Sequence, residues 1–400
     1  MNNIIGSKRY EDIILNYVLL ALVSMNFLGR GSIVLLLFGI YNVLYIKNAK
    51  FTVEGTILLF MSFGMIIAML IFPGVHLITG HSLINEVCKV LNFVLPFIVG
   101  YCGYAMSTDK EKYINRTLFA ICLGYVAHIG LMYINNLRLG IEGRTLVSVW
   151  TGEEIAVTLI GLLSAYVIAY TVSSIIYNPK LLVKLFSVVG IIMVILINMQ
   201  TATRTPFLLM IMLLALLLVM GFAANENKNY THLLVFVFIA VLLFLLFEMN
   251  LFGVKTAVLE SPIVDRFQDE GMESSRTEIA KEYFNIMFDH PWGGGFGLET
   301  TNHNAHNFWQ QFYDFYGIIP FMLALVVTAS MFIKMIQLFA IKYKKSFEYT
   351  LISIYLITFI QMLLEPVVTG YPILFWTLLL VHGMASAHYK ENYAKTEIKR

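Results

Sequence analysis

Apolar runs of about 20 residues recur along the whole chain, and this repetition constrains the fold more than any other feature. As a helix, a run of that length crosses the ~30 Å hydrocarbon core of a bilayer. Inside lipid the backbone must satisfy its own hydrogen bonds, so such runs fold as helices. Of the 400 residues, 58% are hydrophobic and 13% are charged, against roughly 25% charged in soluble domains. We predict an all-α, polytopic integral membrane protein with one transmembrane domain over residues 1–400.

Hydropathy predicts about twelve membrane spans, with one large loop between the ninth and the tenth. The first apolar run follows Lys8 and Arg9, but no small-residue cleavage site comes after it, so we expect an uncleaved anchor. The large loop covers residues 250–307 and is far longer than the other connections. The predicted spans are 12–29, 31–46, 56–74, 88–106, 114–134, 155–177, 182–199, 206–223, 231–249, 308–333, 349–364 and 369–387.

The basic residues are divided unevenly between the two sides of the predicted membrane. With the N-terminus inside, eighteen of the 27 Lys and Arg residues fall on the inner side and nine on the outer side. Cytoplasmic segments collect Lys and Arg, so we expect both termini in the cytoplasm and the large loop outside.

Arginine nevertheless gathers on the predicted outer side, where six of the nine arginines but three of the eighteen lysines fall. The guanidinium group binds phosphate with two parallel hydrogen bonds and keeps its charge near a low-dielectric boundary. An arginine-rich outer face therefore indicates a binding site for a polyanion or a pyrophosphate, although scatter among a few solvated residues is the alternative. The six are Arg30, Arg138, Arg144, Arg204, Arg266 and Arg276.

Within the large loop, Ser275 and Glu278 have the spacing of a capping box and predict the start of a helix. Pro291 ends the helical pattern, and we expect the helix to lie on the outer membrane surface. Arg276 in its first turn is beside the positive helix end, so its partner is either a nearby glutamate or a substrate phosphate. The expected apolar face consists of Ile279, Tyr283, Phe284 and Met287.

A glycine-rich turn over residues 293–297, centred on Gly295, follows this helix. Its amides could approach a phosphate, but no lysine follows in P-loop spacing. A turn that only redirects the chain is the favoured reading.

The next stretch, TNHNAHNFWQQFYDFYG at residues 301–317, is polar where the chain enters the membrane again. If a helix starts near His306, then Gln310, Asp314 and Gly317 share a stripe with it. A polar stripe at this place should face a protein-lined cavity rather than lipid. Histidine titrates near neutral pH and can take a proton from a sugar hydroxyl, although a lone interfacial histidine is more often structural. His303 and Asn307 are the other polar candidates here.

Three residues outside this stretch complete the set of candidates. Arg204 comes just before the eighth span, where we expect Thr203 to cap the helix and Arg204 either to bind an anion or to extend toward water. Glu365, before the last span, could be an acid, a base or an arginine partner. Arg30 lies in the first outer loop. The three cysteines lack metal-ligand spacing, and we expect no metal, no cofactor and no nucleic-acid partner.

The order of these motifs resembles the bacterial O-antigen ligase and O-antigen or capsule polymerase superfamily. Arg204 opens a span, Arg276 begins an outer helix, and the sequence HPWGGGFG follows at residues 290–297. His306 and Asn307 then precede Gly317 by the H-N-x9-G spacing of the ligases. The resemblance covers residues ~185 to 335. Ligases tend to have a small or hydroxylated residue three places after that glycine, where this chain has Pro320, and this departure favours a polymerase.

The resemblance implies a metal-independent, inverting glycosyltransferase at the outer face of the bacterial inner membrane. Its donor would be an oligosaccharide on undecaprenyl pyrophosphate, and a polymerase would transfer it to the terminal sugar of another lipid-linked repeat unit. Arg204 and Arg276 would hold the pyrophosphate, and His306 would orient or deprotonate the acceptor hydroxyl. The resemblance also implies a chain-length regulator protein and membrane lipid as partners of a polymerase.

Three other functions remain open at this point. The ligase would pass a finished glycan to lipid A core. A lipid-linked oligosaccharide transporter or flippase would also have about twelve spans, but such carriers usually show paired halves, which this chain lacks. A metal-dependent membrane glycosyltransferase would resemble proteins with an acidic pair in the first outer loop, where this chain has only Gly29, Arg30 and Gly31.

Overall fold

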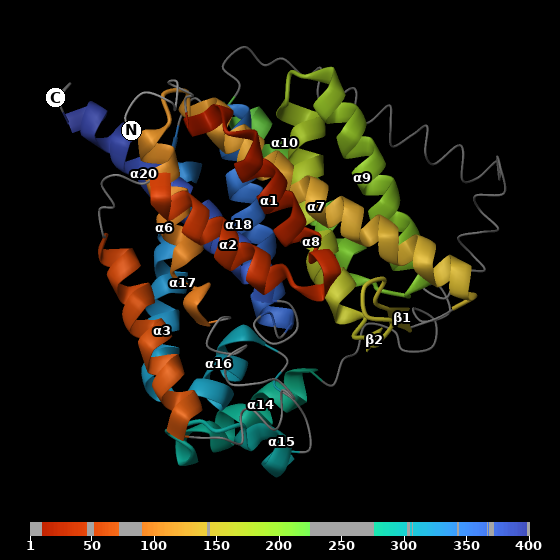
Figure 1. Ribbon diagram of the computed structural model, residues 1–400, viewed down its shortest axis with the longest axis vertical. Coiled ribbons are helices and arrows are strands. Elements are labelled where there is room, and N and C mark those ends of the chain that lie inside the picture. Colours follow the sequence, from red (N-terminus) through yellow and green to blue (C-terminus); the bar gives the residue numbers. More distant parts are fainter. Residues whose placement is uncertain are drawn as a thin grey trace. The chain divides into compact units, whose positions relative to one another are not determined.

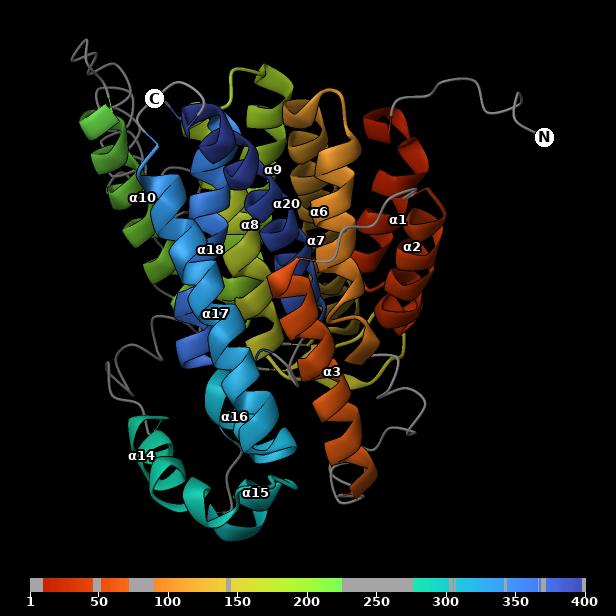
Figure 2. The same cartoon turned by 90° about the vertical axis from the view of Figure 1, so that its left-hand side faces the viewer.

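The structure is a computed structural model, and it describes residues 10–45, 52–71, 90–141, 145–224, 276–301, 305, 307–341, 344–365, 367 and 372–397. These residues form two compact units (Figures 1 and 2). Unit 1 comprises Met1–Tyr125, Ser275–Ala340 and Thr358–Arg400, and unit 2 comprises Val126–Ser274 and Ile341–Ile357. Helices α7 and α18 contribute to both units.

The described part of the chain is almost entirely helical. One small antiparallel hairpin pairs Leu146 with Ile155 and Val147 with Glu154. The elements in chain order are η1 Tyr10–Asp12, α1 Ile14–Ser24, η2 Phe27–Gly29, α2 Gly31–Tyr45, α3 Val53–Ile71, α6 Leu95–Met106, α7 Lys110–Leu139, β1 Leu146–Val147, β2 Glu154–Ile155, α8 Thr158–Tyr177, α9 Leu181–Gln200, α10 Thr205–Ala224, α14 Arg276–Ile286, η4 Met287–Asp289, α15 Phe296–Thr301, α16 Phe308–Tyr316, α17 Ile318–Phe339, α18 Ser346–Leu364 and α20 Pro372–Glu397.

Six described helices are long and apolar enough to cross a membrane, namely α3, α7, α8, α9, α17 and α18. Helices α1, α2, α6 and α10 are apolar but shorter. The predicted all-α fold is therefore confirmed, and the six helices are consistent with the predicted polytopic membrane protein. The count of twelve spans stays a prediction, and the predicted span 231–249 lies outside the described residues.

The predicted tenth span is wrong at its start. Residues 308–333 were expected to form one helix, but the chain breaks at Gly317, which has φ +78°. Helix α16 ends before this glycine, and α17 begins after it and continues to Phe339. A glycine inside an apolar run does not by itself predict a break, because isolated glycines are tolerated in helices.

Close backbone packing joins the helices of unit 1. Helices α6 and α20 approach so closely that a Cβ atom at Gly383 would lie 2.8 Å from the amide nitrogen of Tyr101. Small residues at such a crossing are how membrane helices bring their backbones together. The hydroxyl of Tyr104 also pairs with Nδ1 of His388 at 2.9 Å, which links the same two helices.

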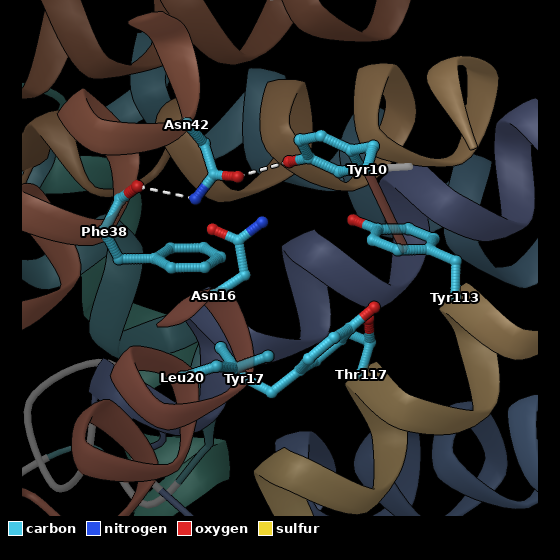
Figure 3. A pocket seen from close by; sticks show the side chains of 8 residues that line it. All are labelled: Tyr10, Asn16, Tyr17, Leu20, Phe38, Asn42, Tyr113 and Thr117. Atoms are coloured by element: carbon cyan, nitrogen blue, oxygen red, sulfur yellow. Dashed lines mark hydrogen bonds between the residues drawn. The ribbon is translucent and has the colours of Figure 1, made fainter. Parts of the chain in front are cut away.

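A small pocket lies where η1, α1, α2 and α7 meet, within unit 1 (Figure 3). The Tyr10 hydroxyl donates to Oδ1 of Asn42, and the Asn42 amide group donates to the Phe38 carbonyl at 2.8 Å. The side chain of Asn42 therefore has a structural role, and it ties the start of the described chain to α2. The pocket is lined by Tyr10, Asn16, Tyr17, Leu20, Phe38, Asn42, Tyr113 and Thr117.

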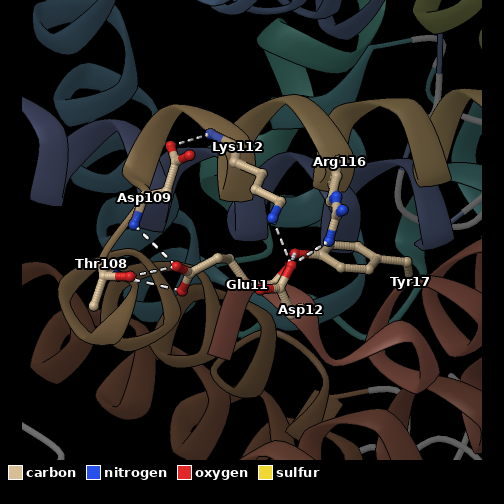
Figure 4. A network of polar contacts seen from close by, with 7 residues as sticks. All are labelled: Glu11, Asp12, Tyr17, Thr108, Asp109, Lys112 and Arg116. Carbon is tan, nitrogen blue, oxygen red and sulfur yellow. Dashed lines mark hydrogen bonds and ion pairs between the residues drawn. The ribbon is translucent and has the colours of Figure 1, made fainter. Parts of the chain in front are cut away.

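A network of ionised side chains fastens η1 to the connection between α6 and α7 (Figure 4). We call it the polar latch, and it consists of Glu11, Asp12, Thr108, Asp109, Lys112 and Arg116. The buried carboxylate of Glu11 accepts from the Thr108 hydroxyl at 2.5 Å and from the amides of Thr108 and Asp109 at 3.2 and 3.1 Å. Asp12 pairs with Lys112 at 2.6 Å and with Arg116 at 3.0 Å.

The contacts of the latch lower the pKa of both carboxyl groups. Burial by itself raises the pKa of Glu11, but the hydrogen bonds from Thr108 and from nearby backbone amides outweigh it, and the pKa falls below its ordinary value. The pKa of Asp12 is lowered chiefly by its hydrogen bond from Lys112, with further help from the charge of Arg116. Both groups are therefore ionised in the folded protein at neutral pH.

Candidate functional site

The helix predicted in the large loop is present as α14, which begins at Arg276. It continues through the short turn η4 and ends before Pro291, as the sequence indicates. Ile279, Tyr283 and Met287 are buried, as expected of its apolar face. Phe284 is not part of that buried face, because 60% of its surface is exposed. The prediction that Phe284 belongs to the apolar face that packs on the protein is therefore wrong.

Helix α16 begins with a cap that fixes its position. The side-chain oxygen of Asn307 accepts from the backbone amide of Gln310 at 2.8 Å, as an N-cap residue does. The Asn307 amide group also donates to Oε1 of Gln310 at 2.6 Å. The Gln310 Nε2 atom donates to the Ala280 carbonyl of α14 at 2.5 Å. The two candidates therefore bind each other, and through Gln310 they connect α16 to α14.

The glycine-rich turn is bonded to the end of α16. Gly293, Gly294 and Gly295 have φ of +74°, +98° and +83°, in the left-handed region that favours glycine. The Gly295 amide donates to the Asp314 carbonyl at 2.8 Å, and the Gly297 amide donates to Oδ1 of Asp314 at 2.9 Å. These two amides have protein partners, which agrees with the favoured reading of the stretch as a turn.

The same turn explains why residue 317 is a glycine. A Cβ atom at Gly317 would lie 2.6 Å from the Trp292 carbonyl carbon and 2.9 Å from the Pro291 carbonyl oxygen. In the other direction, a Cβ atom at Gly293 would lie 2.5 Å from the Gly317 nitrogen. The Ile318 amide then donates to the Pro291 carbonyl at 2.9 Å. The two parts of the motif, HPWGGGFG and the glycine after H-N-x9, thus contact each other backbone to backbone.

Aromatic rings fill the space between these helices. His290 stacks on Phe296 with ring centroids 4.6 Å apart, and Phe296 meets Tyr313 edge to face at 6.3 Å. The Tyr313 ring continues to Phe321 of α17 at 5.3 Å. Burial raises the pKa of the Tyr313 hydroxyl. The small core formed here consists of Ile279, Tyr283, Met287, Phe296, Ala305 and Tyr313.

Other aromatic residues attach α16 to the rest of unit 1. Phe308 lies 5.0 Å from Phe375 of α20, and Phe312 lies 6.4 Å from Phe93, measured between ring centroids. The Trp309 indole donates to the Thr328 hydroxyl of α17 at 3.3 Å.

We call the assembly of α14, η4, α15, α16 and the first turn of α17 the corner. Its helices are bonded to one another and anchored on the bundle of unit 1.

The structure brings Gly295, Asn307, Gln310 and Asp314 together in the corner. Gln310 and Asp314 are bonded to backbone atoms of α14 and α15, and Asp314 is buried. The predicted protein-lined cavity beside them stays a prediction. His303, His306 and Arg266 lie outside the described residues. Arg276 is the first residue of α14, and its side chain is outside the described set as well.

Arg204 belongs to unit 2, in the tight connection between α9 and α10. Thr201 and Thr203 share a hydrogen bond between their hydroxyl groups at 2.9 Å, and the Thr203 amide donates to the Asn198 carbonyl at 3.0 Å. Helix α10 begins at Thr205, so the half-buried Arg204 occupies the N-cap position and Thr203 precedes it. The prediction that Thr203 caps this helix is wrong for that reason.

The remaining candidates both lie in unit 1. Arg30 is exposed after η2, in a turn where Asn26 and Leu28 have positive φ, and the Gly31 amide donates to the Asn26 side chain at 2.9 Å. Glu365 follows α18, is buried, and accepts through its carbonyl from the Val367 amide at 2.9 Å. Among the residues that the structure describes, no group of three His, Cys, Asp or Glu side chains is placed to hold a metal ion.

Residues 189–324 match the family model described as O-antigen ligase. This segment, about a third of the chain, is similar to the O-antigen polymerase and ligase superfamily. The match confirms the resemblance, and it contains Arg204, Arg276, His306 and Gly317 together with the whole corner. The superfamily covers O-antigen ligases and polymerases, which are glycosyltransferase-like enzymes with lipid-linked polysaccharide substrates in a membrane. No curated protein matches the chain.

Two features of this segment were not predicted from the sequence. The Asn-x-x-Gln pattern of Asn307 and Gln310 is a local capping signal that could have predicted the start of α16. The contact between Gly293 and Gly317 has no local signal, because it joins residues that are far apart in sequence.

Proposed function

We propose that the protein is a polymerase of lipid-linked oligosaccharide repeat units, of the O-antigen or capsule kind. The hydroxyl oxygen of an acceptor sugar, itself on undecaprenyl pyrophosphate, attacks the anomeric carbon of the donor glycan. The bond from that carbon to the donor phosphate breaks, undecaprenyl pyrophosphate leaves, and attack from the opposite face inverts the configuration. The acceptor hydroxyl gives up its proton to a base on the protein.

The corner is the observation that carries this proposal. It lies within the O-antigen ligase match, and its capped helix, glycine turn and small core are built from the motif residues themselves. Ala305 is buried in the core and Asn307 caps α16, so the residues on both sides of His306 are held by contacts. A base must keep its place relative to a reacting hydroxyl, and a rigid support provides this.

In the proposed mechanism, His306 takes the proton of the acceptor hydroxyl. Arg204 and Arg276 bind the pyrophosphate and neutralise the charge that develops on the leaving group. Arg266, Arg30, Glu365 and His303 complete the substrate-binding set. Asn307, Gln310, Asp314 and Gly295 act as positioning residues, because their described bonds connect α14, α15 and α16. The reaction is metal-independent, since the glycosyl phosphate bond is already activated and the arginines supply the positive charge.

The identity of residue 320 supports a polymerase over a ligase. Pro320 is buried in the first turns of α17, and a Cβ atom at Gly64 of α3 would lie 3.3 Å from its ring. A ring packed between two helices offers no hydroxyl to a substrate. The ligase, which transfers the glycan to lipid A core, is the alternative function within the family.

The proposed location is the bacterial inner membrane, with both termini in the cytoplasm and the corner outside. Within unit 1, the start of α1 and the end of α20 lie at one end and α14 and α15 at the other (Figure 2). Lys110 pairs with Glu391 at 3.1 Å at the end that carries the termini, which agrees with the accumulation of lysine on the cytoplasmic side. A chain-length regulator is the proposed protein partner.

Surface glycan from a deletion strain tests the proposal. A polymerase deletion leaves single repeat units attached to the core, whereas a ligase deletion leaves bare core and free lipid-linked polymer. In the complemented strain we expect His306→Ala and Arg276→Ala to leave single units while the protein still inserts. Arg138→Ala, which removes an exposed outer-side arginine, is the matched control and should keep the ladder. Long chains with either site variant would remove that residue from the mechanism.

The arginine contacts and the absence of a metal requirement are tested in vitro. Arg204→Lys keeps the charge but loses the planar fork, so we expect transfer from purified lipid-linked donor to fall by about tenfold or more if phosphate is bound by two parallel bonds. Full activity would instead indicate that Arg204 only extends toward water. Activity should persist with chelator, and its loss would favour a metal-dependent enzyme.

A further inference from the structure

Three large aromatic side chains stand exposed on the corner, although the residues beside them are buried. Phe284, Phe288 and Trp292 expose 60%, 60% and 63% of their surface. The rings of Phe284 and Phe288 meet edge to face at 5.7 Å, so they form one patch. We call these three residues the aromatic rim. Soluble surfaces seldom expose several neighbouring large aromatics without a partner.

Most polar residues of α14 lie away from this patch, and Lys281, three residues before Phe284, borders it. The i, i+4 spacing places Phe284 and Phe288 in one row, next to the buried row of Tyr283 and Met287. Exposed polar residues occupy the remaining arc, and they are Glu278, Lys281, Glu282 and Asn285. The helix therefore has three sides, which face the small core, an open apolar region and water.

The rim is continuous with the part of α17 that enters the membrane. The Ile318 amide donates to the Pro291 carbonyl at 2.9 Å, and the Trp292 carbonyl lies against Gly317. The first turns of α17 expose Ile319 and Met322 at 59% and 53%, as a helix that faces lipid does. Because α17 is long and apolar enough to span the bilayer, we place the edge of the hydrocarbon region at its first turn.

The geometry points to the interfacial layer of the bilayer as the occupant of the rim, where headgroups meet acyl chains. Trp and Phe on the apolar side of an amphipathic helix bury themselves at this depth, with the polar side toward water. The direct bond between residues 318 and 291 places Trp292 level with the point where α17 enters the hydrocarbon. The rim thus anchors the corner to the membrane surface and fixes its depth.

This anchoring has a functional consequence if the proposed transfer reaction also holds. The phosphates of membrane lipids and of a prenyl pyrophosphate lie at the same level of the bilayer. A corner fixed by its rim would keep the residues on both sides of His306 at that level. The anchoring itself depends only on the contacts of the corner, so it stands or falls separately from the reaction.

Tryptophan fluorescence tests the rim in the full-length protein in lipid nanodiscs. Acyl chains brominated near the headgroup or near the bilayer centre serve as quenchers, and the emission of Trp292 is obtained as the difference between the parent and Trp292→Phe. We expect this difference signal to be quenched by shallow bromines more than by deep ones. Equal emission in brominated and ordinary lipid would overturn the proposal.

Two further arms decide what covers the rim. Phe284→Ser with Phe288→Ser should weaken the shallow quenching, whereas Phe60→Ser, which removes a side chain 63% exposed on the spanning helix α3, should not. Unchanged quenching in the double variant would contradict the rim as the anchor. Addition of undecaprenyl phosphate should leave the quenching unchanged, and its loss would mean that a prenyl chain, rather than bilayer lipid, is the occupant. The sugar ladder of each variant reports the reaction independently.

Discussion

At the polar latch, ionised side chains hold unit 1 together, whereas at the corner the backbone and aromatic rings do so. The latch depends on the carboxylates of Glu11 and Asp12, which accept bonds from a hydroxyl, from amides and from cations. The corner depends on glycines with positive φ that allow the chain to approach itself, and on stacked rings. The two regions lie at opposite ends of the unit (Figure 2).

This difference indicates that the latch and the corner must hold their parts of the chain with different rigidity. Charge-assisted bonds respond to pH and to salt, and such contacts suffice to fasten a terminal segment. Backbone contact between glycines is independent of both, and it tolerates almost no change of side chain. A region that must hold a reactive group in place therefore benefits from the second kind of contact.

The largest expected effect is that of Gly317→Ala. The new Cβ would meet the Trp292 carbonyl carbon at 2.6 Å, and the residue would also have to keep φ at +78°. Backbone strain and overpacking together should lower the free energy of unfolding by about 2–5 kcal/mol. They should also separate the glycine turn from α16. Thermal unfolding in detergent measures the loss, and the sugar ladder should collapse to single units.

Gly152→Ala is the matched control for this substitution. Gly152 has φ +71°, but a Cβ atom there would have nothing within 4 Å. Gly152→Ala should therefore lower the free energy of unfolding only through the positive φ of the new alanine, by about 1 kcal/mol. If both variants lose the same stability, the close contact between Gly317 and the turn contributes nothing and the contrast between the two ends fails.

An intermediate effect is expected for Glu11→Gln at the latch. The amide oxygen can still accept a hydrogen bond, but the charge is lost, which should cost about 1–2 kcal/mol at pH 7. Because the folded-state pKa of Glu11 lies below its usual value, the carboxylate stabilises the folded protein at neutral pH. That contribution is present above the ordinary pKa of a glutamate and disappears as the pH falls through the lower folded-state pKa.

Unfolding temperatures of the parent and of Glu11→Gln, measured between pH 7 and pH 3, check this expectation. The difference between the two proteins should shrink as the pH falls, because the parent loses the same charge that the variant lacks. Glu111→Gln, at an exposed carboxylate in the first turn of α7, should show little difference at any pH. A difference for Glu11→Gln that is constant with pH would mean that shape, rather than charge, holds the latch.

Much of unit 1 follows from local patterns in the sequence. Apolar runs predict the spanning helices, because burial in lipid leaves the backbone no other structure. The capping box and the apolar spacing predict α14, and Pro291 predicts its end. These signals are readable because each depends on residues within a few turns of one another.

The contacts that shape the corner could not be predicted in the same way. The break at Gly317 is imposed by Trp292, a residue 25 positions earlier in the sequence, and local hydropathy continues through it. Likewise, Asp314 accepts hydrogen bonds from amides of the glycine turn only because the turn folds back on α16. No local pattern in the sequence predicts this fold-back. Phe284 has the spacing of a core residue, and its exposure reflects a limited protein surface on that side of α14.

The smallest expected effect is that of Lys112→Met, which removes the shortest ion pair of the latch. Its ammonium group lies 2.6 Å from Asp12, but both side chains are more than a third exposed, and Arg116 remains beside the same carboxylate. Exposed pairs of this kind contribute little to the free energy of unfolding and are screened by salt. We expect an unfolding temperature close to that of the parent, with the small difference vanishing in 1 M salt as the Debye length falls to about 3 Å. A large loss that disappears in 1 M salt would place the strength of the latch in its exposed charges rather than in the buried carboxylate of Glu11.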